Sequence, residues 1–331
     1  MSQKVAVLGA GSWGTALAIH LARVGHEVRL WGRDCALVED MSARRANAVY
    51  LSDVNFPDAL TPTASLDTAI AGVGMVVLAI PSHGLRHVLG AASSALSKDI
   101  LVVSATKGLE EQTLLRMSQV VGEAAPQVRE IAVVSGPSFA AELARELPTA
   151  VVVASTTNGA VEHVQREFRS GAFRLYGSSD VVGVEIGGAL KNIIAIAAGV
   201  VEGLGLGHNA LAALITRGLA EIARLAVALG AQRETLAGLA GLGDLVLTCT
   251  GDLSRNRHVG IELAHGRTLT DIVASTRMVA EGVRTTRAAI ELGKQHGVEL
   301  PIATQMGEVL EGRRDPRSAV YELMGRRQKQ E

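Results

Sequence analysis

The sequence predicts an α/β protein in which a doubly wound parallel sheet is followed by an all-α C-terminal domain. Up to about residue 180, short runs of Val, Ile and Leu alternate with helical segments, and after that point helical patterns remain. A glycine-rich turn also joins the first apolar run to the first helical segment. Near-continuous apolar runs are typical of strands buried on both faces, as in parallel sheets. Their alternation with helices indicates a doubly wound sheet.

The first strand is expected over Val5–Leu8, and a helix is expected from Thr15 to Val24, closed by Gly25. The turn between them reads Gly9-Ala10-Gly11-Ser12-Trp13-Gly14, and G-x-G-x-x-G between a strand and a helix predicts a Rossmann-type dinucleotide site. In such a turn Gly9 allows the tight bend and Gly11 lets the backbone approach a pyrophosphate. Gly14 lets the helix pack closely on the strand. The start of the helix would face the phosphate charge. A glycine turn of purely structural use is the alternative.

Further strands are expected wherever a short apolar run recurs in the first half of the chain: Val28–Trp31, Met75–Ile80, Ile100–Ser104, Ile131–Ser135, Ala150–Ala154 and Phe173–Tyr176. The segment Thr61–Asp67 has prolines nearby and is expected to be a loop or a short edge strand.

After Asp180 the chain is helix-forming to Gly230, apart from the break Gly203-Leu204-Gly205-Leu206-Gly207. Further helices are expected over Asn256–His265, Leu269–Ser275, Val283–His296, Ile302–Glu311 and Pro316–Met324. We therefore expect a dinucleotide-binding Rossmann domain over residues 1–180 and an all-helical substrate and dimerisation domain over residues 181–331.

The composition bounds the function. With 32 Lys and Arg against 33 Asp and Glu, the net charge of −1 gives no global field that would attract nucleic acid or an anionic membrane. The longest apolar stretch, Ile193–Val201, is too short to span a membrane and is expected to be a buried helix.

Cys35 and Cys249 are expected to be free thiols in a reducing compartment. No zinc-ligand spacing is present, so no metal is expected. Because no secretory leader is seen, the cytoplasm is the expected location.

The end of the second strand indicates which dinucleotide binds. NAD sites usually place an acidic residue there for the ribose hydroxyls. Here the strand is followed by Gly32, Arg33 and Asp34. The planar fork of Arg33 suits a 2′-phosphate, although a small shift in register would aim Asp34 at the ribose. NADPH is the expected cofactor, with NADH also accepted, and an ordinary surface role is the alternative for Arg33.

Candidate site residues follow the strand ends, where ligands bind in open α/β sheets. Lys107 follows one strand, and Gly136 and Ser138 follow the next, so these three should converge. For Lys107 a solvated loop lysine is an equal alternative.

Lys191 lies in a segment that is apolar on nearly every side, Ile186 to Ile196. A buried lysine must be paired or lose its proton, so we interpret Lys191 as functional, with a snorkelling side chain as the alternative.

Two further sites lie in the second half of the chain. Asp244 is the single acid of a glycine-rich apolar segment, and it could equally be a helix N-cap. Ser254 can cap the helix that starts near Asn256, and that helix start with Arg255 makes an anion site suited to a phosphate monoester. A capped helix with solvated arginines is the structural alternative. The histidines His83, His208 and His258 lack telling partners and are interpreted as structural.

These segments together resemble the bacterial type of NAD(P)-dependent glycerol-3-phosphate dehydrogenase from end to end. The resemblance rests on the glycine turn and on Ser104-Ala105-Thr106-Lys107-Gly108-Leu109-Glu110, Ser135-Gly136-Pro137-Ser138-Phe139-Ala140, Leu190-Lys191-Asn192, Gly241-Leu242-Gly243-Asp244-Leu245, Ser254-Arg255-Asn256 and Glu281-Gly282.

The resemblance implies reversible reduction of dihydroxyacetone phosphate to sn-glycerol 3-phosphate for phospholipid synthesis, with Lys191 as proton donor and acceptor. It implies cofactor contacts at Ser12, Trp13, Arg33, Lys107, Ala140, Arg255, Val279 and Glu281. It implies substrate contacts at Lys107, Gly136, Ser138, Lys191, Asp244, Ser254, Arg255 and Asn256. It also implies a C-terminal domain like that of 6-phosphogluconate dehydrogenase, and a homodimer.

Two other functions remain open at this point. A β-hydroxyacid or ketopantoate-type reductase shares the layout, but its substrate carries a carboxylate where the anion site at Ser254-Arg255-Asn256 favours a phosphate. A non-enzymatic NADP(H) sensor is the second, and such a protein would not need Lys107, Lys191 and Asp244 together.

Overall fold

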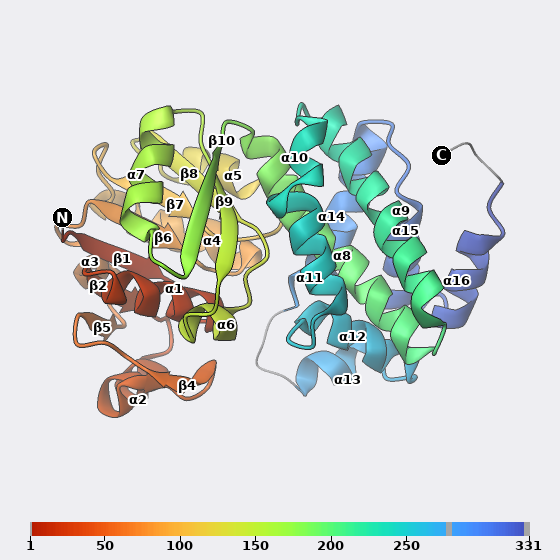
Figure 1. Ribbon diagram of the computed structural model, residues 1–331, viewed down its shortest axis with the longest axis horizontal. Helices are drawn as coiled ribbons and strands as arrows, with labels where there is room; N and C mark the ends of the chain where they lie inside the picture. Colours follow the sequence, from red (N-terminus) through yellow and green to blue (C-terminus); the bar gives the residue numbers. More distant parts are fainter. Residues whose placement is uncertain (1, 276–279, 328–331) are drawn as a thin grey trace. The chain divides into compact units, whose positions relative to one another are not determined.

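The computed structural model describes residues 2–275 and 280–327, and the chain forms two compact units (Figure 1). Unit 1 comprises Met1–Lys107 and Leu115–Glu185, and unit 2 comprises Gly108–Leu114 and Ile186–Glu331. The carboxylate of Glu185 accepts hydrogen bonds from the backbone N–H and the hydroxyl of Ser118, at 2.7 and 2.6 Å. These bonds tie the start of the long helix that follows Asp180 to unit 1.

Unit 1 contains an eight-stranded sheet in the order β10-β9-β8-β7-β6-β1-β2-β5. Its strands are β1 (Lys4–Leu8), β2 (Glu27–Trp31), β5 (Leu60–Thr63), β6 (Met75–Leu78), β7 (Leu101–Ser104), β8 (Glu130–Ser135), β9 (Thr149–Ala154) and β10 (Phe173–Ser178). Every expected strand is present, and the proline-flanked segment forms the edge strand β5. The order reverses between β1 and β6, and ligands of doubly wound sheets bind at such a switch point.

Two features of the strands in unit 1 were not predicted. Strand β9 runs antiparallel to β8, whereas all other neighbours in the sheet are parallel. The connection over residues 136–148 contains only the five-residue helix α6 (Ala140–Ala144), so the chain re-enters the sheet at the end where β8 finishes. A short antiparallel pair, β3 (Ala46–Asn47) with β4 (Leu51–Asn55), also lacks an apolar run in the sequence.

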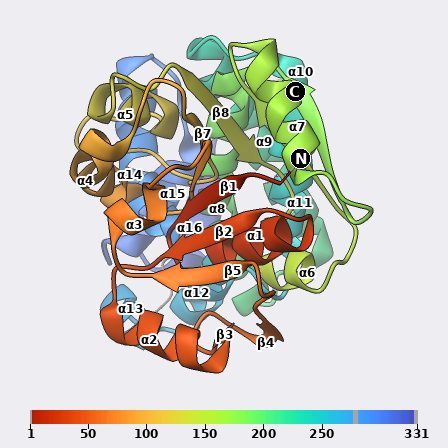
Figure 2. The same cartoon turned by 90° about the vertical axis from the view of Figure 1, so that its left-hand side faces the viewer.

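Helices cover both faces of the sheet (Figure 2). Along β1, Val5 and Val7 pack into one core, while Ala6 and Leu8 pack into the other. The first core is shared by α1 (Ser12–Arg23), α2 (Cys35–Arg44), α6 and α7 (Asn158–Phe168), and the second by α3 (Leu66–Ile70), α4 (Ser82–Ala92) and α5 (Met117–Ala124). The doubly wound class is therefore confirmed.

The described residues of unit 2 contribute helices and no strand to the structure. The helices are α8 (Val181–Gly203), whose residues 181–185 belong to unit 1, α9 (Gly207–Ala228), α10 (Arg233–Ala237), the π-helical turn Leu239–Gly243, α11 (Asp244–Thr250), α12 (Arg255–Ala264), α13 (Leu269–Ala274), α14 (Glu281–Gln295), α15 (Pro301–Leu310) and α16 (Pro316–Met324). Helix α8 is long and apolar enough to cross a membrane by length and composition alone, and 89% of its most apolar window is buried inside the structure. Ile193–Val201 is buried within it, as expected.

A buried carboxylate makes the stability of unit 2 depend on pH. Glu221 of α9 accepts hydrogen bonds from the backbone N–H groups of Ile302 and Ala303 at the start of α15, at 2.7 and 3.3 Å. Burial nevertheless raises the pKa of Glu221 from 4.5 to about 7. The folded state then binds more protons than the unfolded state between these two values, so the stability contribution of this group falls as pH rises from about 4.5 to about 7.

Replacing Glu221 by glutamine should remove this fall, because a neutral amide carries no charge to desolvate. The slope of the free energy of unfolding against pH should be flatter in the variant by up to ~1.4 kcal/mol per pH unit. Urea titrations at pH 5 to 8 measure it, with the exposed Glu291→Gln as control. Parallel pH profiles for wild type and Glu221→Gln would show that Glu221 does not titrate in this range.

Candidate active site

The glycine turn of unit 1 has the geometry of a cradle for phosphate. Gly9 has a φ of +118°, and a Cβ there would lie 2.5 Å from the carbonyl oxygen of Ala79. A Cβ on Gly14 would lie 1.9 Å from the carbonyl oxygen of Gly9, whereas a Cβ on Gly11 would meet nothing within 4 Å. The first and third glycines are therefore required by the protein itself, and Gly11 leaves open space beside the backbone.

The start of α1 also fits a dinucleotide. Gly11 is its N-cap and provides no side-chain cap, and the first N–H groups of a helix have no partner within the helix. The indole N–H of Trp13 is buried without a hydrogen-bond partner among the described residues. Ser12 is the first residue of the helix. These donors suit the charge of a pyrophosphate.

At the end of β2, the side chain of Arg33 is exposed. Asp34 is instead the N-cap of α2, and its carboxylate accepts hydrogen bonds from the backbone N–H groups of Ala36 and Leu37, at 3.0 and 3.2 Å. Asp34 therefore has structural partners of its own in the first turn of α2.

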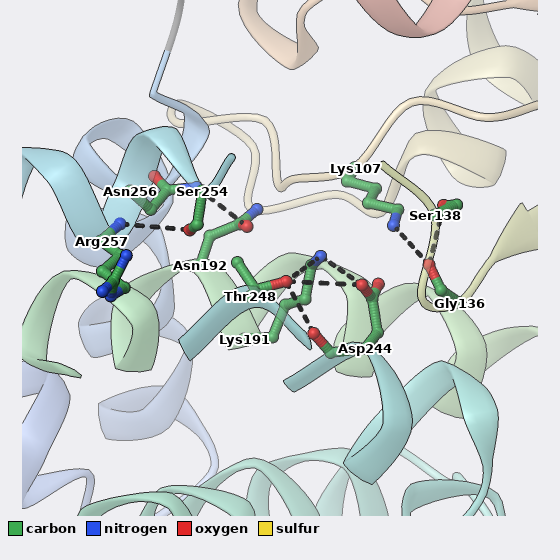
Figure 3. A network of polar contacts seen from close by, with 10 residues as sticks. All are labelled: Lys107, Gly136, Ser138, Lys191, Asn192, Asp244, Thr248, Ser254, Asn256 and Arg257. Carbon is green, nitrogen blue, oxygen red and sulfur yellow. Dashed lines mark hydrogen bonds and ion pairs between the residues drawn. The ribbon is translucent and has the colours of Figure 1, made fainter. Parts of the chain in front are cut away.

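Three expected site residues meet at the carboxyl ends of β7 and β8 (Figure 3). The Nζ of Lys107 donates to the carbonyl oxygen of Gly136 at 3.2 Å, and the hydroxyl of Ser138 donates to the same oxygen at 2.9 Å. Gly136 has a φ of +146°, and a Cβ there would lie 2.9 Å from the Cα of Val151, which explains the glycine. Ala140 begins α6 directly after this loop.

Lys191 of α8 is buried in unit 2 and has fixed partners (Figure 3). Its Nζ donates to Oδ1 of Asp244 at 2.5 Å and to Oγ1 of Thr248 at 2.7 Å. The hydroxyl of Thr248 donates to the carbonyl oxygen of Asp244 at 2.6 Å, so its remaining lone pairs face the amine. The side chains of Lys191 and Asp244 are 8% and 0% exposed. The snorkelling alternative for Lys191 is therefore wrong.

The surroundings of Lys191 decide between the two interpretations of Asp244 and add one residue that was not predicted. Asp244 is the first residue of α11 and follows the N-cap Gly243, so it is the partner of Lys191 and not a helix cap. Thr248 was not predicted, although it lies four residues after Asp244 and so on the same face of a helix. The neighbouring Cys249 is a free thiol whose pKa burial raises to about 12, and it stays neutral. Cys35, the other free thiol, is exposed.

The expected cap of α12 is present. The hydroxyl of Ser254 caps the helix by accepting from the N–H of Arg257 at 3.2 Å. Asn256 donates from Nδ2 to Oδ1 of Asn192 at 3.0 Å and accepts at Oδ1 from the N–H of Gly282, also at 3.0 Å. Arg255 is exposed on the first turn. Asn192, which follows Lys191 directly, was not among the predicted residues.

Other residues singled out in the sequence lie as follows. Glu281 begins α14, and Val279 lies outside the described residues. The side chains of His83, His208 and His258 are exposed. Among residues 2–275 and 280–327, no group of three or more His, Cys, Asp or Glu side chains could hold a metal ion.

The fold and the glycine turn define a dinucleotide-binding protein of the Rossmann type, with a buried lysine and carboxylate pair in its helical unit. Comparisons with known proteins narrow this class. Sequence models of the N-terminus and the C-terminus of NAD-dependent glycerol-3-phosphate dehydrogenase match residues 4–161 and 180–321. The chain belongs to this family of oxidoreductases.

Individual relatives agree over the whole chain. A glycerol-3-phosphate dehydrogenase [NAD(P)+] of Geobacter sp. (strain M21) is 52% identical over 333 residues, which cover 100% of this chain and 99% of the relative. One of Koribacter versatilis (strain Ellin345) is 53% identical over 327 residues, covering 98% of this chain and 97% of the relative. The crystal structure of glycerol-3-phosphate dehydrogenase from Coxiella burnetii matches with a TM-score of 0.95 and 41% identity, over 98% of this chain and 99% of that one.

Proposed function

We propose that the protein reversibly reduces dihydroxyacetone phosphate to sn-glycerol 3-phosphate with NADPH, and also accepts NADH. Family membership supports this reaction. The observation that carries it is the buried Lys191, whose amine has two fixed acceptors, Asp244 and Thr248. A carboxylate substrate would be expected of a ketopantoate-type reductase, and the helix start at Arg255 favours a phosphate.

The cofactor would be held by the glycine turn and by charged residues around it. When bound, a reduced nicotinamide supplies a hydride to the carbonyl carbon of the substrate. The residues that we assign to cofactor binding are Gly9, Gly11, Ser12, Trp13, Gly14, Arg33, Lys107, Ala140, Arg255, Val279 and Glu281. The backbone geometry of the turn and the uncapped start of α1 support this assignment for unit 1.

Lys191 would stabilise the reaction and move the proton. As the carbonyl carbon is reduced, negative charge builds on its oxygen, and a nearby ammonium group stabilises that charge. The same Nζ then gives a proton to the oxygen, which becomes the hydroxyl of the product. In the reverse direction it takes that proton back. Asp244 and Thr248 aim the amine and compensate its burial.

The phosphate would bind at the start of α12, where Ser254 and Asn256 flank Arg255. A doubly charged phosphate gains from the helix N-terminus and from the guanidinium fork. Binding it would orient the carbonyl that is to be reduced. The residues that we assign to substrate binding are Lys107, Gly136, Ser138, Lys191, Asp244, Ser254, Arg255 and Asn256, with Asp244 acting through Lys191 because its side chain is fully buried.

The reverse reaction tests this function by comparing the two enantiomers of the phosphorylated alcohol. Wild-type protein, NADP+ and sn-glycerol 3-phosphate should give rising absorbance at the NADPH band, whereas the enantiomer sn-glycerol 1-phosphate should give at most a few percent of that rate. Reduction of NADP+ by neither enantiomer, in a protein that binds NADP+, would count against the proposal and favour the sensor.

Arg33 is expected to set the preference for NADPH. Replacing it by serine removes the guanidinium that would pair with the 2′-phosphate, so kcat/KM for NADPH should fall by about 10- to 100-fold while that for NADH changes little, as for loss of one charge-assisted bond of ~1.5–3 kcal/mol. Initial rates with both cofactors measure this. An unchanged ratio of the two would remove Arg33 from the cofactor site.

Arg255 is expected to act on substrate affinity. In Arg255→Ala the helix start and Ser254 remain, so the KM for dihydroxyacetone phosphate should rise by about 10- to 100-fold, as for loss of a charged phosphate contact. Steady-state kinetics at saturating NADPH measure the change. The exposed Arg287→Ala is the control. An unchanged KM in Arg255→Ala would move the phosphate site elsewhere.

We further propose that the protein acts in the cytoplasm, feeds glycerophospholipid synthesis and forms a homodimer. Residues 1–180 would serve as the dinucleotide-binding domain, and residues 181–331 as the domain for substrate and dimerisation. The relatives named above support the metabolic role. Sedimentation of the purified protein tests the dimer.

A further inference from the structure

Helices α8 and α12 meet at a contact that leaves no room for side chains. A Cβ on Gly199 of α8 would lie 1.9 Å from the carbonyl oxygen of Arg257, and a Cβ on Gly260 of α12 would lie 1.9 Å from the carbonyl oxygen of Ile196. One turn further on, a Cβ on Gly203 would lie 2.7 Å from the Cβ of Ala264. The two backbones therefore touch along two turns, and any added carbon must push the helices apart.

The side chain of Arg257 links the first turn of α12 to α8 next to this contact. Its guanidinium is bidentate on Glu202 of α8, with Nε to Oε2 at 2.6 Å and Nη2 to Oε1 at 2.7 Å. Its Nη1 donates to Oδ1 of Asp252 at 3.2 Å, and its backbone N–H donates to the capping hydroxyl of Ser254. The side chain of Arg257 is 14% exposed. Bidentate pairs of this kind fix geometry as well as charge.

Helices α8 and α12 carry residues of the proposed reaction. Lys191 and Asn192 lie on α8 about two turns before Gly199, a rise of ~10–12 Å. Ser254 and Asn256 lie at the start of α12, and Asn256 reaches Asn192 across the 3.0 Å hydrogen bond. Figure 3 shows the side chains of Asn256 and Arg257 leaving this turn in different directions. Arg257 thus holds the turn without taking part in that hydrogen bond.

We propose that Arg257 is a positioning residue, which through Glu202 and the Gly199–Gly260 contact sets the offset between the phosphate anchor at the start of α12 and the amine of Lys191. This inference rests on the proposed function. A phosphate held at the right offset places the carbonyl at the amine, so the binding energy of the phosphate becomes orientation of the reacting group. If the start of α12 is displaced, it still binds the phosphate, but the carbonyl of the substrate no longer lies at the amine of Lys191.

The test compares two substrates in Arg257→Gln. Dihydroxyacetone phosphate uses the anchor, whereas dihydroxyacetone lacks the phosphate and cannot. We expect kcat/KM for the phosphate ester to fall by about 10- to 100-fold, since a misplacement of ~1 Å can cost ~100-fold. The rate with dihydroxyacetone, which we expect to be slow, should change by less than about 2-fold. A residue that only stabilises the fold would lower both activities alike.

Two further variants sharpen the comparison. Glu202→Gln breaks the same pair from the other side, and the double variant should be no worse than either single one, because both remove one interaction. Arg313→Gln breaks a comparable bidentate pair with Glu308, at 3.0 and 2.7 Å, and should leave both activities unchanged. If Arg257→Gln does not fold, Glu202→Gln, whose side chain is 44% exposed, decides the question.

Gly260→Ala tests the helix contact itself. It should cause the same selective loss, whereas Gly90→Ala on α4, where a Cβ would meet nothing within 4 Å, should cause none. The inference would be overturned if Arg257→Gln and Glu202→Gln lost activity equally with both substrates. It would also be overturned if neither variant lost activity with the phosphate ester. A wild-type protein that does not reduce dihydroxyacetone phosphate at all would instead overturn the proposed function, and this inference with it.

Discussion

Replacing Lys191 by methionine should lower kcat by about 10⁴-fold while leaving the affinity for NADPH within about 2-fold. Methionine keeps the length and bulk of the side chain but removes both the positive charge near the developing oxyanion and the proton that the oxygen needs. Loss of a general acid costs ~10²–10⁴-fold, and loss of charge stabilisation costs ~10²–10³-fold. The two losses overlap because one amine does both. Single-turnover kinetics and NADPH titration measure the two quantities.

A control must separate chemistry from folding, because Lys191→Met leaves the buried carboxylate of Asp244 without its cation. Breaking a buried ion pair from one side can cost ~3–5 kcal/mol. The double variant Lys191→Met with Asp244→Asn has no buried charge at this position and should regain much of the lost stability, but none of the lost activity. Activity within about 10-fold of wild type in either variant would show that Lys191 is not the proton donor.

Two alanine substitutions in the glycine turn should separate the fold from the cofactor site. In Gly14→Ala the new Cβ would lie 1.9 Å from the carbonyl oxygen of Gly9, so β1 and α1 must move apart. We expect a loss of stability of about 1–3 kcal/mol, as for overpacking, together with weaker NADPH binding. In Gly11→Ala the new Cβ meets nothing within 4 Å, so stability should be unchanged.

NADPH affinity should nevertheless fall by about 100-fold or more in Gly11→Ala, because this glycine lets the backbone approach the pyrophosphate. Thermal unfolding and fluorescence titration of NADPH, applied to both variants, provide the comparison. If Gly11→Ala binds NADPH like wild type, then the open space beside Gly11 is not where the pyrophosphate lies.

Much of the fold could be predicted because its signals are local. The apolar runs of the sheet strands and the periodicity of the C-terminal helices correspond to elements that pack on a core along their length. The pair β3 and β4 was missed because β3 has only two residues and neither strand contains an apolar run. The antiparallel orientation of β9 was missed because orientation depends on the path of a connection, and apolar runs carry no direction.

The candidate site was predictable in its residue types and less so in its partnerships. The apolar surroundings of Lys191 pointed to a buried cation, but its acceptors come from a helix more than fifty residues away and could not be read from its own segment. Asp34 shows the converse: its type suited a ribose, yet its position before α2 made it a helix cap. The glycine contact between α8 and α12 could not be predicted from the sequence, because the distance between two helices depends on tertiary packing.

The measurement that tests the central claim most directly is the initial rate of NADPH oxidation by the wild-type protein with dihydroxyacetone phosphate. Dihydroxyacetone and ketopantoate, at the same concentrations, are the comparison substrates. The account predicts rapid oxidation with the phosphate ester and rates at least about 100-fold lower with the other two, because they lack the group that the start of α12 would bind. Faster oxidation with ketopantoate, or no oxidation by a protein that binds NADPH, would contradict it.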